Sequence, residues 1–172
     1  MSWLIVAPFE AASMDLARIE TLRKRHDPNQ AIIPAHVTLV FPFTPQDPEA
    51  VRAHFEAVAA TQVRIRCRLA AYLAVRDAED RTSHVFMVPD TGRAEIEALH
   101  DQLYDGPLAD ALRLDIPFIP HVTVAAFDHH DEAEELVRSL GRVGVAGWLN
   151  RLDLLEFLEG RVTPIARIDL LG

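Results

Sequence analysis

The alternation of apolar and polar positions divides the chain into short strands and amphipathic helices. Apolar runs of strand length occur at residues 2–9, 32–41, 62–75, 83–89, 116–126, 152–158 and 162–170. Between them, apolar residues recur at helical spacing at residues 13–26, 47–58, 92–104 and 131–141. Helices and strands mostly alternate, but neighbouring strand runs near residues 62–89 and 152–170 indicate hairpins. The pattern predicts an α+β fold with antiparallel or mixed sheets.

Polar and helix-breaking residues support several of these boundaries. Ser13, Asp47 and Asp131 precede apolar stripes and are candidate N-caps. Gly141 is placed to end the last helix, because glycine adopts the left-handed conformation common at helix ends. The polar segment at residues 76–82 is predicted to be the turn between two paired strands.

Two of the predicted strands carry the same tripeptide, His-Val-Thr. The first lies in "IIPAHVTLVF" at residues 32–41, and the second lies in "FIPHVTVAAF" at residues 118–127. Each is followed by an amphipathic helix and then by two strands, so the chain has two halves of similar plan. A length of 172 residues fits a single domain, and we expect one domain across residues 1–172.

The two tripeptides offer a specific chemistry. Residues two apart in a strand share a face, so His36 projects with Thr38, and His121 projects with Thr123. Val37 should point into the core, and so should the central valine of the second tripeptide. If the two strands are neighbours, two imidazoles and two hydroxyls face one cleft. Imidazoles exchange protons near neutral pH and hydroxyls bind phosphate oxygens, so the pattern predicts acid–base catalysis at a phosphoryl group without a metal.

The run at residues 62–75 alternates cleanly. One face is expected to be buried and holds Val63, Ile65, Cys67 and Leu69; the other holds arginines at 64, 66 and 68. A solvated sheet face is the favoured interpretation of the arginines, with Arg66 as a candidate contact to phosphate or an RNA end. Further candidate substrate contacts are Phe43 and Tyr72, by base stacking or else as core residues, and His84, by entering the same cleft.

Two other features receive the simpler interpretation. The acidic and histidine-rich segment "DHHDEAEE" at residues 128–135 is interpreted as a helix start rather than as a metal site, because Asp131 and Glu134 fit a capping role. Cys67 is the only cysteine, so no intrachain disulfide can form. It is expected to be a buried filler of the core.

Composition and charge limit the range of partners. The net charge is −9, which argues against binding along a nucleic-acid duplex but leaves room for one terminal or small phosphate. No apolar run reaches transmembrane length, and the first residues lack the basic region of a signal peptide. We therefore expect a cytoplasmic, monomeric protein whose partner carries one terminal or small phosphate, with no membrane contact, no metal and no cofactor.

The paired His-x-Thr-x motifs resemble those of the 2H phosphoesterase superfamily, which includes the 2′-5′ RNA ligase-like proteins and the 2′,3′-cyclic phosphodiesterases. "PAHVTLVFPF" is similar to the first motif of the bacterial 2′-5′ RNA ligase-like branch, and "PHVTVA" to the second. The resemblance implies a bilobal fold, with two pseudo-symmetric sheets and outer helices around a central cleft. It implies that His36 and His121 are the catalytic pair and that Thr38 and Thr123 hold phosphate.

One departure from that pattern follows the second motif. Many relatives carry a basic residue there, whereas this chain has alanines at 125 and 126, so a further phosphate contact must come from elsewhere. Three functions stay open at this point. The favoured one is hydrolysis of 2′,3′-cyclic or related phosphodiesters at an RNA terminus or on a small cyclic nucleotide, with 2′-5′ RNA ligation as the reverse chemistry. The others are a nucleotide-binding or phosphate-binding module without turnover, and a metal-dependent hydrolase that uses His36, His121 and a carboxylate.

Overall fold

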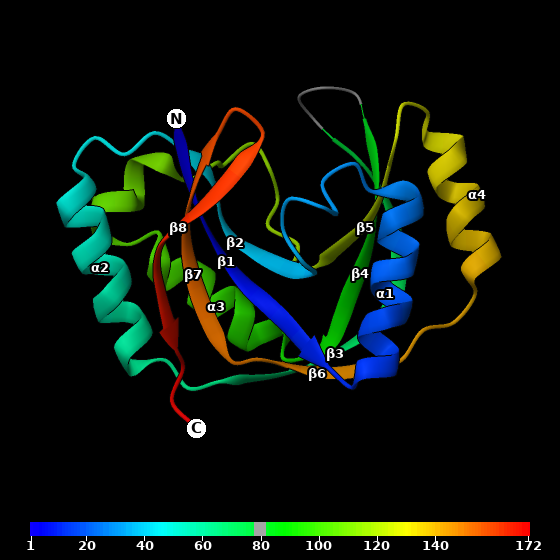
Figure 1. Ribbon diagram of the computed structural model, residues 1–172, viewed down its shortest axis with the longest axis horizontal. Coiled ribbons are helices and arrows are strands. Elements are labelled where there is room, and N and C mark those ends of the chain that lie inside the picture. Colours follow the sequence, from blue (N-terminus) through cyan, green and yellow to red (C-terminus); the bar gives the residue numbers. More distant parts are fainter. Residues whose placement is uncertain (78–81) are drawn as a thin grey trace.

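The computed structural model describes residues 1–77 and 82–172 as eight strands, four α-helices and one short 3-10 helix (Figure 1). The strands are β1 Ser2–Ala11, β2 His36–Phe43, β3 Ile65–Arg76, β4 Ser83–Thr91, β5 Val122–Phe127, β6 Val145–Leu149, β7 Arg151–Leu158 and β8 Arg161–Asp169. The helices are α1 Ser13–His26, α2 Pro48–Thr61, α3 Arg93–Leu103 and α4 His130–Leu140, with the 3-10 helix η1 at Gly106–Ala111. None of the helices in the described part of the chain is both long and apolar enough to span a membrane.

The strands form one continuous sheet in the order β2-β5-β4-β3-β6-β1-β7-β8, with a further pairing of β2 to β1. All pairings between these strands are antiparallel. The predicted α+β class is confirmed, and the two expected sheets are joined into one. The joining element is β1, which pairs with β7 along its first half and with β6 along its last three residues.

In Figure 1, α1 and α4 lie on the right of the sheet, and α2 and α3 lie towards its left. Helices α1 and α4 both contact β5, and α4 also contacts β3 and β4. Helix α2 contacts β7 and β8, while α3 contacts β2, β3 and β4. The two motif strands, β2 and β5, therefore have different helices behind them. Within residues 1–77 and 82–172 they share only one paired position, Val37 with Val122.

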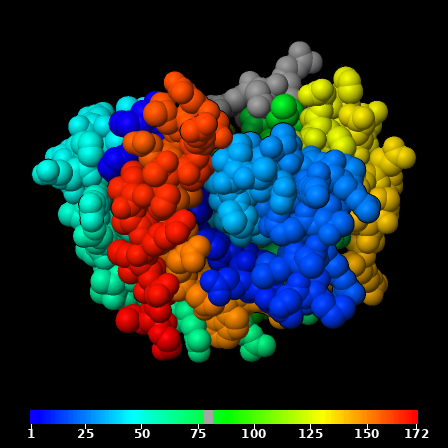
Figure 2. All heavy atoms as spheres, viewed as in Figure 1, coloured from blue at the N-terminus to red at the C-terminus, as the bar shows by residue number. Residues whose placement is uncertain are grey.

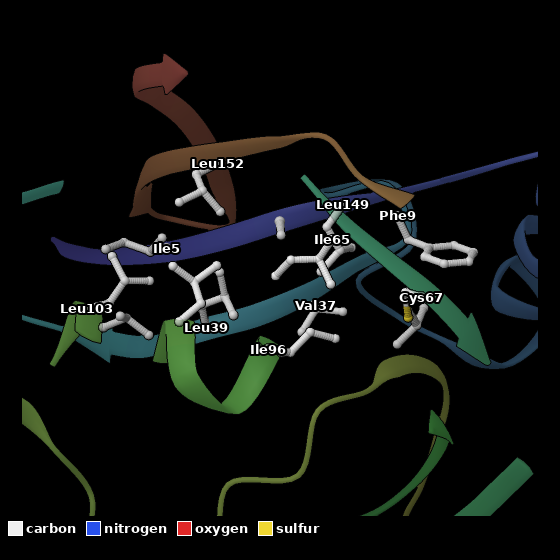
Figure 3. Packing of buried hydrophobic residues seen from close by; sticks show 14 of the residues in the cluster. Ile5, Phe9, Val37, Leu39, Ile65, Cys67, Ile96, Leu103, Leu149 and Leu152 are labelled. Atoms are coloured by element: carbon white, nitrogen blue, oxygen red, sulfur yellow. The ribbon is translucent and has the colours of Figure 1, made fainter. Parts of the chain in front are cut away.

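The core lies where β1, β2, β3 and β6 face α3. Figure 3 shows Ile5, Val37 and Leu39 packing towards Ile96 of α3. Val37 and Val122, the central residues of the two motifs, are both buried, as predicted from the strand period. Burial of side chains of this size contributes about 1.5–3 kcal/mol each to folding.

Several predicted boundaries are confirmed. Asp47 caps α2, because its carboxylate accepts a hydrogen bond of 3.0 Å from the Ala50 backbone N–H. Gly141 ends α4 with a positive φ of 68°. The predicted turn at residues 76–82 includes residues 78–81, which lie outside the described part of the chain.

Other local predictions are wrong. Ala12 and His129 occupy the N-cap positions of α1 and α4, so the expected caps Ser13 and Asp131 lie inside the first turns. Val63 is 55% exposed instead of buried, because it precedes β3 and forms only an isolated bridge with Leu171. The motif strands also begin later than predicted, at His36 and Val122.

The late strand starts and the missed strand β6 have physical causes. Proline lacks the N–H that a strand ladder needs, and Pro34 and Pro120 lie just before the two motifs. Strand β6 lies in a glycine-rich segment that reads as a turn. A Cβ at Gly147 would lie 2.3 Å from the Glu10 carbonyl oxygen, so the close approach of β1 to β6 requires glycine there.

Candidate active site

Both predicted histidine–threonine pairs line a single cavity of about 640 Å³. Its polar lining includes His36 and Thr38 on β2, Thr123 on β5, His121 immediately before β5, and His84 on β4. A volume of this size is typical of small-molecule sites. The structure thus brings together the four motif residues and one of the other candidates, His84.

The same hydrogen bond fixes each motif imidazole. Nδ1 of His36 donates to the Pro34 carbonyl at 2.7 Å, and Nδ1 of His121 donates to the Ile119 carbonyl. Each acceptor lies two residues before its histidine. Because a carbonyl can only accept, Nδ1 carries the hydrogen in both rings, and Nε2 is the nitrogen available to a ligand.

The surroundings favour the neutral form of both rings. Burial lowers the pKa of His121 to about 4, against the weaker opposing effect of the hydrogen bond to Ile119. The positive charges that His36 and His84 can carry lower it further, and Phe86 stacks on the ring with centroids 3.5 Å apart. Burial also lowers the pKa of His36, although the hydrogen bond to Pro34 opposes this effect.

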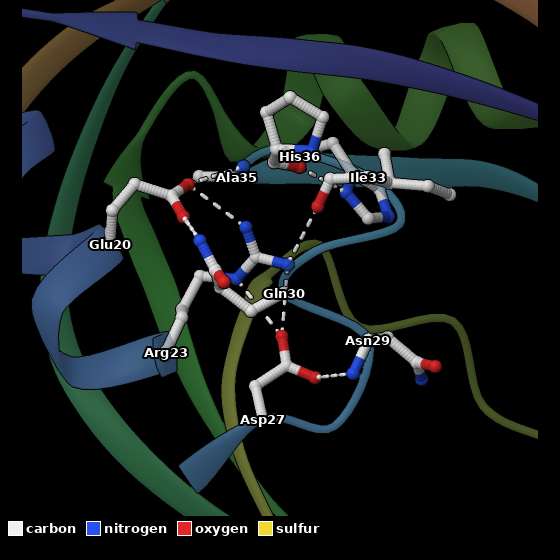
Figure 4. A network of polar contacts seen from close by, with 9 residues as sticks. Glu20, Arg23, Asp27, Asn29, Gln30, Ile33, Ala35 and His36 are labelled. Carbon is white, nitrogen blue, oxygen red and sulfur yellow. Dashed lines mark hydrogen bonds and ion pairs between the residues drawn. The ribbon is translucent and has the colours of Figure 1, made fainter. Parts of the chain in front are cut away.

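A buried polar network on α1 supports the segment that leads to His36 (Figure 4). Arg23 is only 2% exposed and pairs with Asp27 and Glu20, each at 2.9 Å. Its guanidinium also donates to the Ile33 carbonyl at 2.8 Å, and Glu20 accepts the Ala35 N–H at 2.8 Å. In Figure 2 this light-blue segment fills the surface between α1 and the β7–β8 hairpin.

The network also places charged groups near His36. Arg23 lowers the pKa of His36, while the carboxylates of Asp27 and Glu20 raise it. Sequence reasoning missed this group, although Glu20, Arg23 and Asp27 recur at the three- and four-residue spacing of one helix face.

Three of the predicted substrate contacts do not line the cavity. Phe43 pairs with Trp3 of β1, and Tyr72 packs partly buried against the core. Arg66 is exposed on β3, opposite Trp148 of β6, on the solvated face that was the favoured interpretation of the arginine stripe. Arg64 lies over the Trp148 ring at 4.6 Å and Arg68 pairs with Asp90.

Phe41 lines the cavity, because β2 contains a bulge. Val6 pairs with Thr38 and Ile5 with Val40, so Leu39 is left out of the register. The extra residue changes which side chains share the face of Thr38. Other lining residues that sequence reasoning missed are Arg23, Arg76, Phe86, Arg113, Ile116 and Pro117.

His84 takes a position that bears on the alanines after the second motif. It lies opposite Ala126 in the β4–β5 pairing, and both residues line the cavity. Its Nε2 is 3.1 Å from the Thr82 hydroxyl and 3.7 Å from the Asp77 carboxylate. Its Nδ1 is buried without a hydrogen-bond partner in the part of the chain that the structure describes.

The histidine-rich segment after β5 lies at a neighbouring hollow, and of the residues that the structure describes, this hollow shares only Arg76 and Asp77 with the cavity. His130 contacts the Ser83 hydroxyl at 3.1 Å and Glu134 at 3.5 Å. Across residues 1–77 and 82–172, no three histidine, cysteine or acidic side chains are grouped so that they could hold a metal ion.

Comparisons with known proteins give the family and the fold of the chain. The sequence model of the 2′-5′ RNA ligase superfamily matches residues 8–161. A Bacillus pumilus protein named "Putative phosphoesterase" is 30% identical over 158 residues, which cover 87% of this chain and 86% of the relative. Escherichia coli LigT in complex with 3′-AMP has a TM-score of 0.60 at 18% identity, over 99% of this chain and 98% of LigT. Kluyveromyces marxianus Usb1 with uridine monophosphate has a TM-score of 0.58 at 10% identity, over 98% of each chain. At such identities the solved structures show the fold alone.

Proposed function

The chain belongs to the 2′-5′ RNA ligase superfamily, and on this premise we propose that it is a metal-independent phosphoesterase of 2′,3′-cyclic or related phosphodiesters. The substrate is an RNA end or a small nucleotide. One observation carries the proposal: His36 and His121, each with its threonine, line the same cavity and both have Nε2 as the free nitrogen. We further propose that the protein acts as a cytoplasmic monomer with a single domain across residues 1–172.

The proposed reaction moves two protons. One neutral imidazole accepts a proton from water at Nε2 while the water oxygen forms a bond to phosphorus. The other imidazole, protonated, gives its Nε2 proton to the ribose oxygen that leaves, so the ring of the cyclic ester opens to a monoester. Burial lowers the pKa of both rings, so in the free protein both imidazoles favour the neutral form. Which imidazole is the acceptor and which the donor depends on the ribose oxygen that leaves.

The rest of the cavity fits a nucleotide. Thr38 and Thr123 supply hydroxyl donors for the non-bridging phosphate oxygens, and His84 is a further candidate contact. An apolar wall is suited to the nucleoside, and it is formed by Phe41, Pro42, Ile116, Pro117 and Ile119. The solved complexes of LigT with 3′-AMP and of Usb1 with uridine monophosphate support a small nucleotide as ligand.

Replacing Thr38 or Thr123 by valine is expected to lower kcat by about 100-fold to 1,000-fold. Valine keeps the shape and removes the hydroxyl, and losing one preorganised donor to a transition state costs about 10²–10³ in comparable sites. Steady-state kinetics on a 2′,3′-cyclic nucleotide measure the effect. Thr61→Val is the matched control, because the Thr61 hydroxyl bonds the Val58 carbonyl on α2. Equal rates for all three variants would remove the proposed role.

The value of kcat/KM is expected to be highest below pH 6.5 and to fall as the pH rises. The reaction needs one neutral and one protonated imidazole, and kcat/KM follows the pKa values of the free enzyme. Burial lowers the pKa of His36 from 6.5 and that of His121 to about 4, so at higher pH both rings are neutral and the proton donor is lost. Below both pKa values the acceptor is lost. A maximum above about pH 8 would contradict this assignment.

The assay that tests the proposed function uses purified protein, 2′,3′-cyclic nucleotides and a chelator. We expect turnover to a nucleoside monophosphate that is unchanged by the chelator. Binding of these nucleotides without turnover would instead favour a recognition module, for which the alanines at 125 and 126 are the supporting observation. Turnover that the chelator removes would favour the metal-dependent alternative. Incubation of RNA ends that carry the product groups tests ligation, the reverse reaction.

A further inference from the structure

The two motif segments are held together by little direct backbone pairing. Val37 and Val122 form the only register pair between β2 and β5 in the described part of the chain. Contacts from behind the cavity are therefore in a position to influence the distance between His36 and His121, together with the pairing of β2 to β1 and of β5 to β4. A displacement of about 1 Å in a catalytic group can cost about 100-fold in rate, so whatever sets this distance matters for turnover.

His100 on α3 contacts both motif segments. Its Nδ1 donates to the Leu39 carbonyl at 2.7 Å, next to Thr38 in the first motif. Its ring stacks on Phe118, with centroids 3.7 Å apart and planes 9° apart, three residues before His121. His100 is 4% exposed and does not line the cavity, so it acts from behind the site.

The bulge in β2 explains why α3 must supply this contact. Leu39 is left out of the β1–β2 register, and its carbonyl needs a donor because buried backbone groups are costly when unpaired. His100 meets that need. Tyr104, four residues later on the same face, accepts the Phe41 N–H at 3.0 Å and lies edge-on to His100 at 4.8 Å. Burial lowers the pKa of His100, so its imidazole is mainly uncharged at neutral pH.

We propose that His100 is a positioning residue that sets the separation of His36 and His121, through Leu39 on one side and Phe118 on the other. The proposal rests on the proposed function only for its effect on rate. The effect of His100 on the positions of the two motif histidines can be tested without turnover, because the ring protons of both histidines report their surroundings by NMR.

Two substitutions of His100, by asparagine and by phenylalanine, separate its contact with Leu39 from its contact with Phe118. His100→Asn keeps an N–H donor near the position of Nδ1 and loses the ring that stacks on Phe118. The segment that carries His121 then loosens and admits water, so we expect the titration midpoint of His121 to rise from about 4 towards 6.5. The midpoint of His36 should stay unchanged. Phe118→Leu removes the same stacking from the other side and should reproduce this result.

His100→Phe does the reverse, because it keeps a ring on Phe118 and leaves the Leu39 carbonyl without its donor. The disturbance then falls on β2, and we expect the His36 midpoint to move while that of His121 stays in place. Both His100 variants should lower kcat by about 10-fold to 100-fold with KM changed by less than about threefold, because the reacting groups, not the binding surface, are misplaced.

His54→Phe is the matched control. His54 is a partly buried histidine whose Nε2 contacts the Leu103 carbonyl at 3.1 Å, on α2 and away from both motifs. It should leave kcat and both midpoints unchanged. The proposal is overturned if folded His100→Asn, Phe118→Leu and His100→Phe keep both midpoints of the unchanged protein, whatever their thermal stability. Shifted midpoints in a protein that turns over no cyclic nucleotide would support the positioning role and reject the proposed function.

Discussion

Replacing either His36 or His121 by alanine is expected to lower kcat on a 2′,3′-cyclic nucleotide by about 10²–10⁴-fold, the usual contribution of one acid–base group. The two rings share one cavity, and each reaction cycle needs both proton transfers. Once one proton transfer is lost, the remaining imidazole accelerates the reaction only a little. The loss of kcat on replacing both residues is therefore far smaller than the two single losses combined. The kcat of the double variant should therefore be no more than about 10-fold below that of the less active single variant.

The control for these variants is His129→Ala. His129 is exposed at the start of α4, makes no side-chain capping bond and lies outside the cavity. It should keep the full rate. All assays include a chelator, and thermal unfolding confirms that each variant is folded. A single His36 or His121 variant that retains more than about a tenth of the rate would show that its imidazole is not an acid or base of the reaction.

Replacing Arg23 by methionine is expected to lower the free energy of unfolding by about 3–5 kcal/mol, the usual cost of breaking a buried ion pair from one side. The variant leaves the Asp27 carboxylate, 3% exposed, without its cation, and leaves the Ile33 carbonyl without its donor. It also removes a positive charge that lowers the pKa of His36, while the carboxylates that raise it stay. The His36 midpoint should therefore rise.

Urea unfolding measures the stability change, and Arg93→Met is its matched control. Arg93 pairs with Glu97 one helical turn away, and both side chains are largely exposed, at 56% and 41%. Such pairs contribute about 0.5 kcal/mol at most. A loss below about 1 kcal/mol for Arg23→Met would mean that the network is not a stabilising element of the segment before His36.

The parts of the fold and site that follow a short local period were predictable from sequence. The strand period of two placed His36 with Thr38 and buried Val37, and an aspartate before Pro48 identified the start of α2. The site as a shared cavity followed from the repeat of one tripeptide in two strands. Its catalytic role stays a prediction for the experiments above.

The parts that depend on contacts between distant segments were not predictable. The bulge at Leu39 arises from pairing with β1, and it brings Phe41 to the cavity, although simple alternation places residue 41 on the face opposite Thr38. Strand β6 is recognisable only from its partners, because Gly147 is needed by the close approach of β1 and reads as a turn in isolation. His100 lies within a predicted helix, but only the tertiary structure gives it two motif segments to contact.

The most direct test of the central claim is a crystal structure of the protein with a nucleoside 3′-monophosphate. We predict that one phosphate group lies within about 2.7–3.2 Å of Nε2 of both His36 and His121, with the hydroxyls of Thr38 and Thr123 on its other oxygens. A phosphate held by only one of the two imidazoles, or bound outside the cavity that both line, would contradict it.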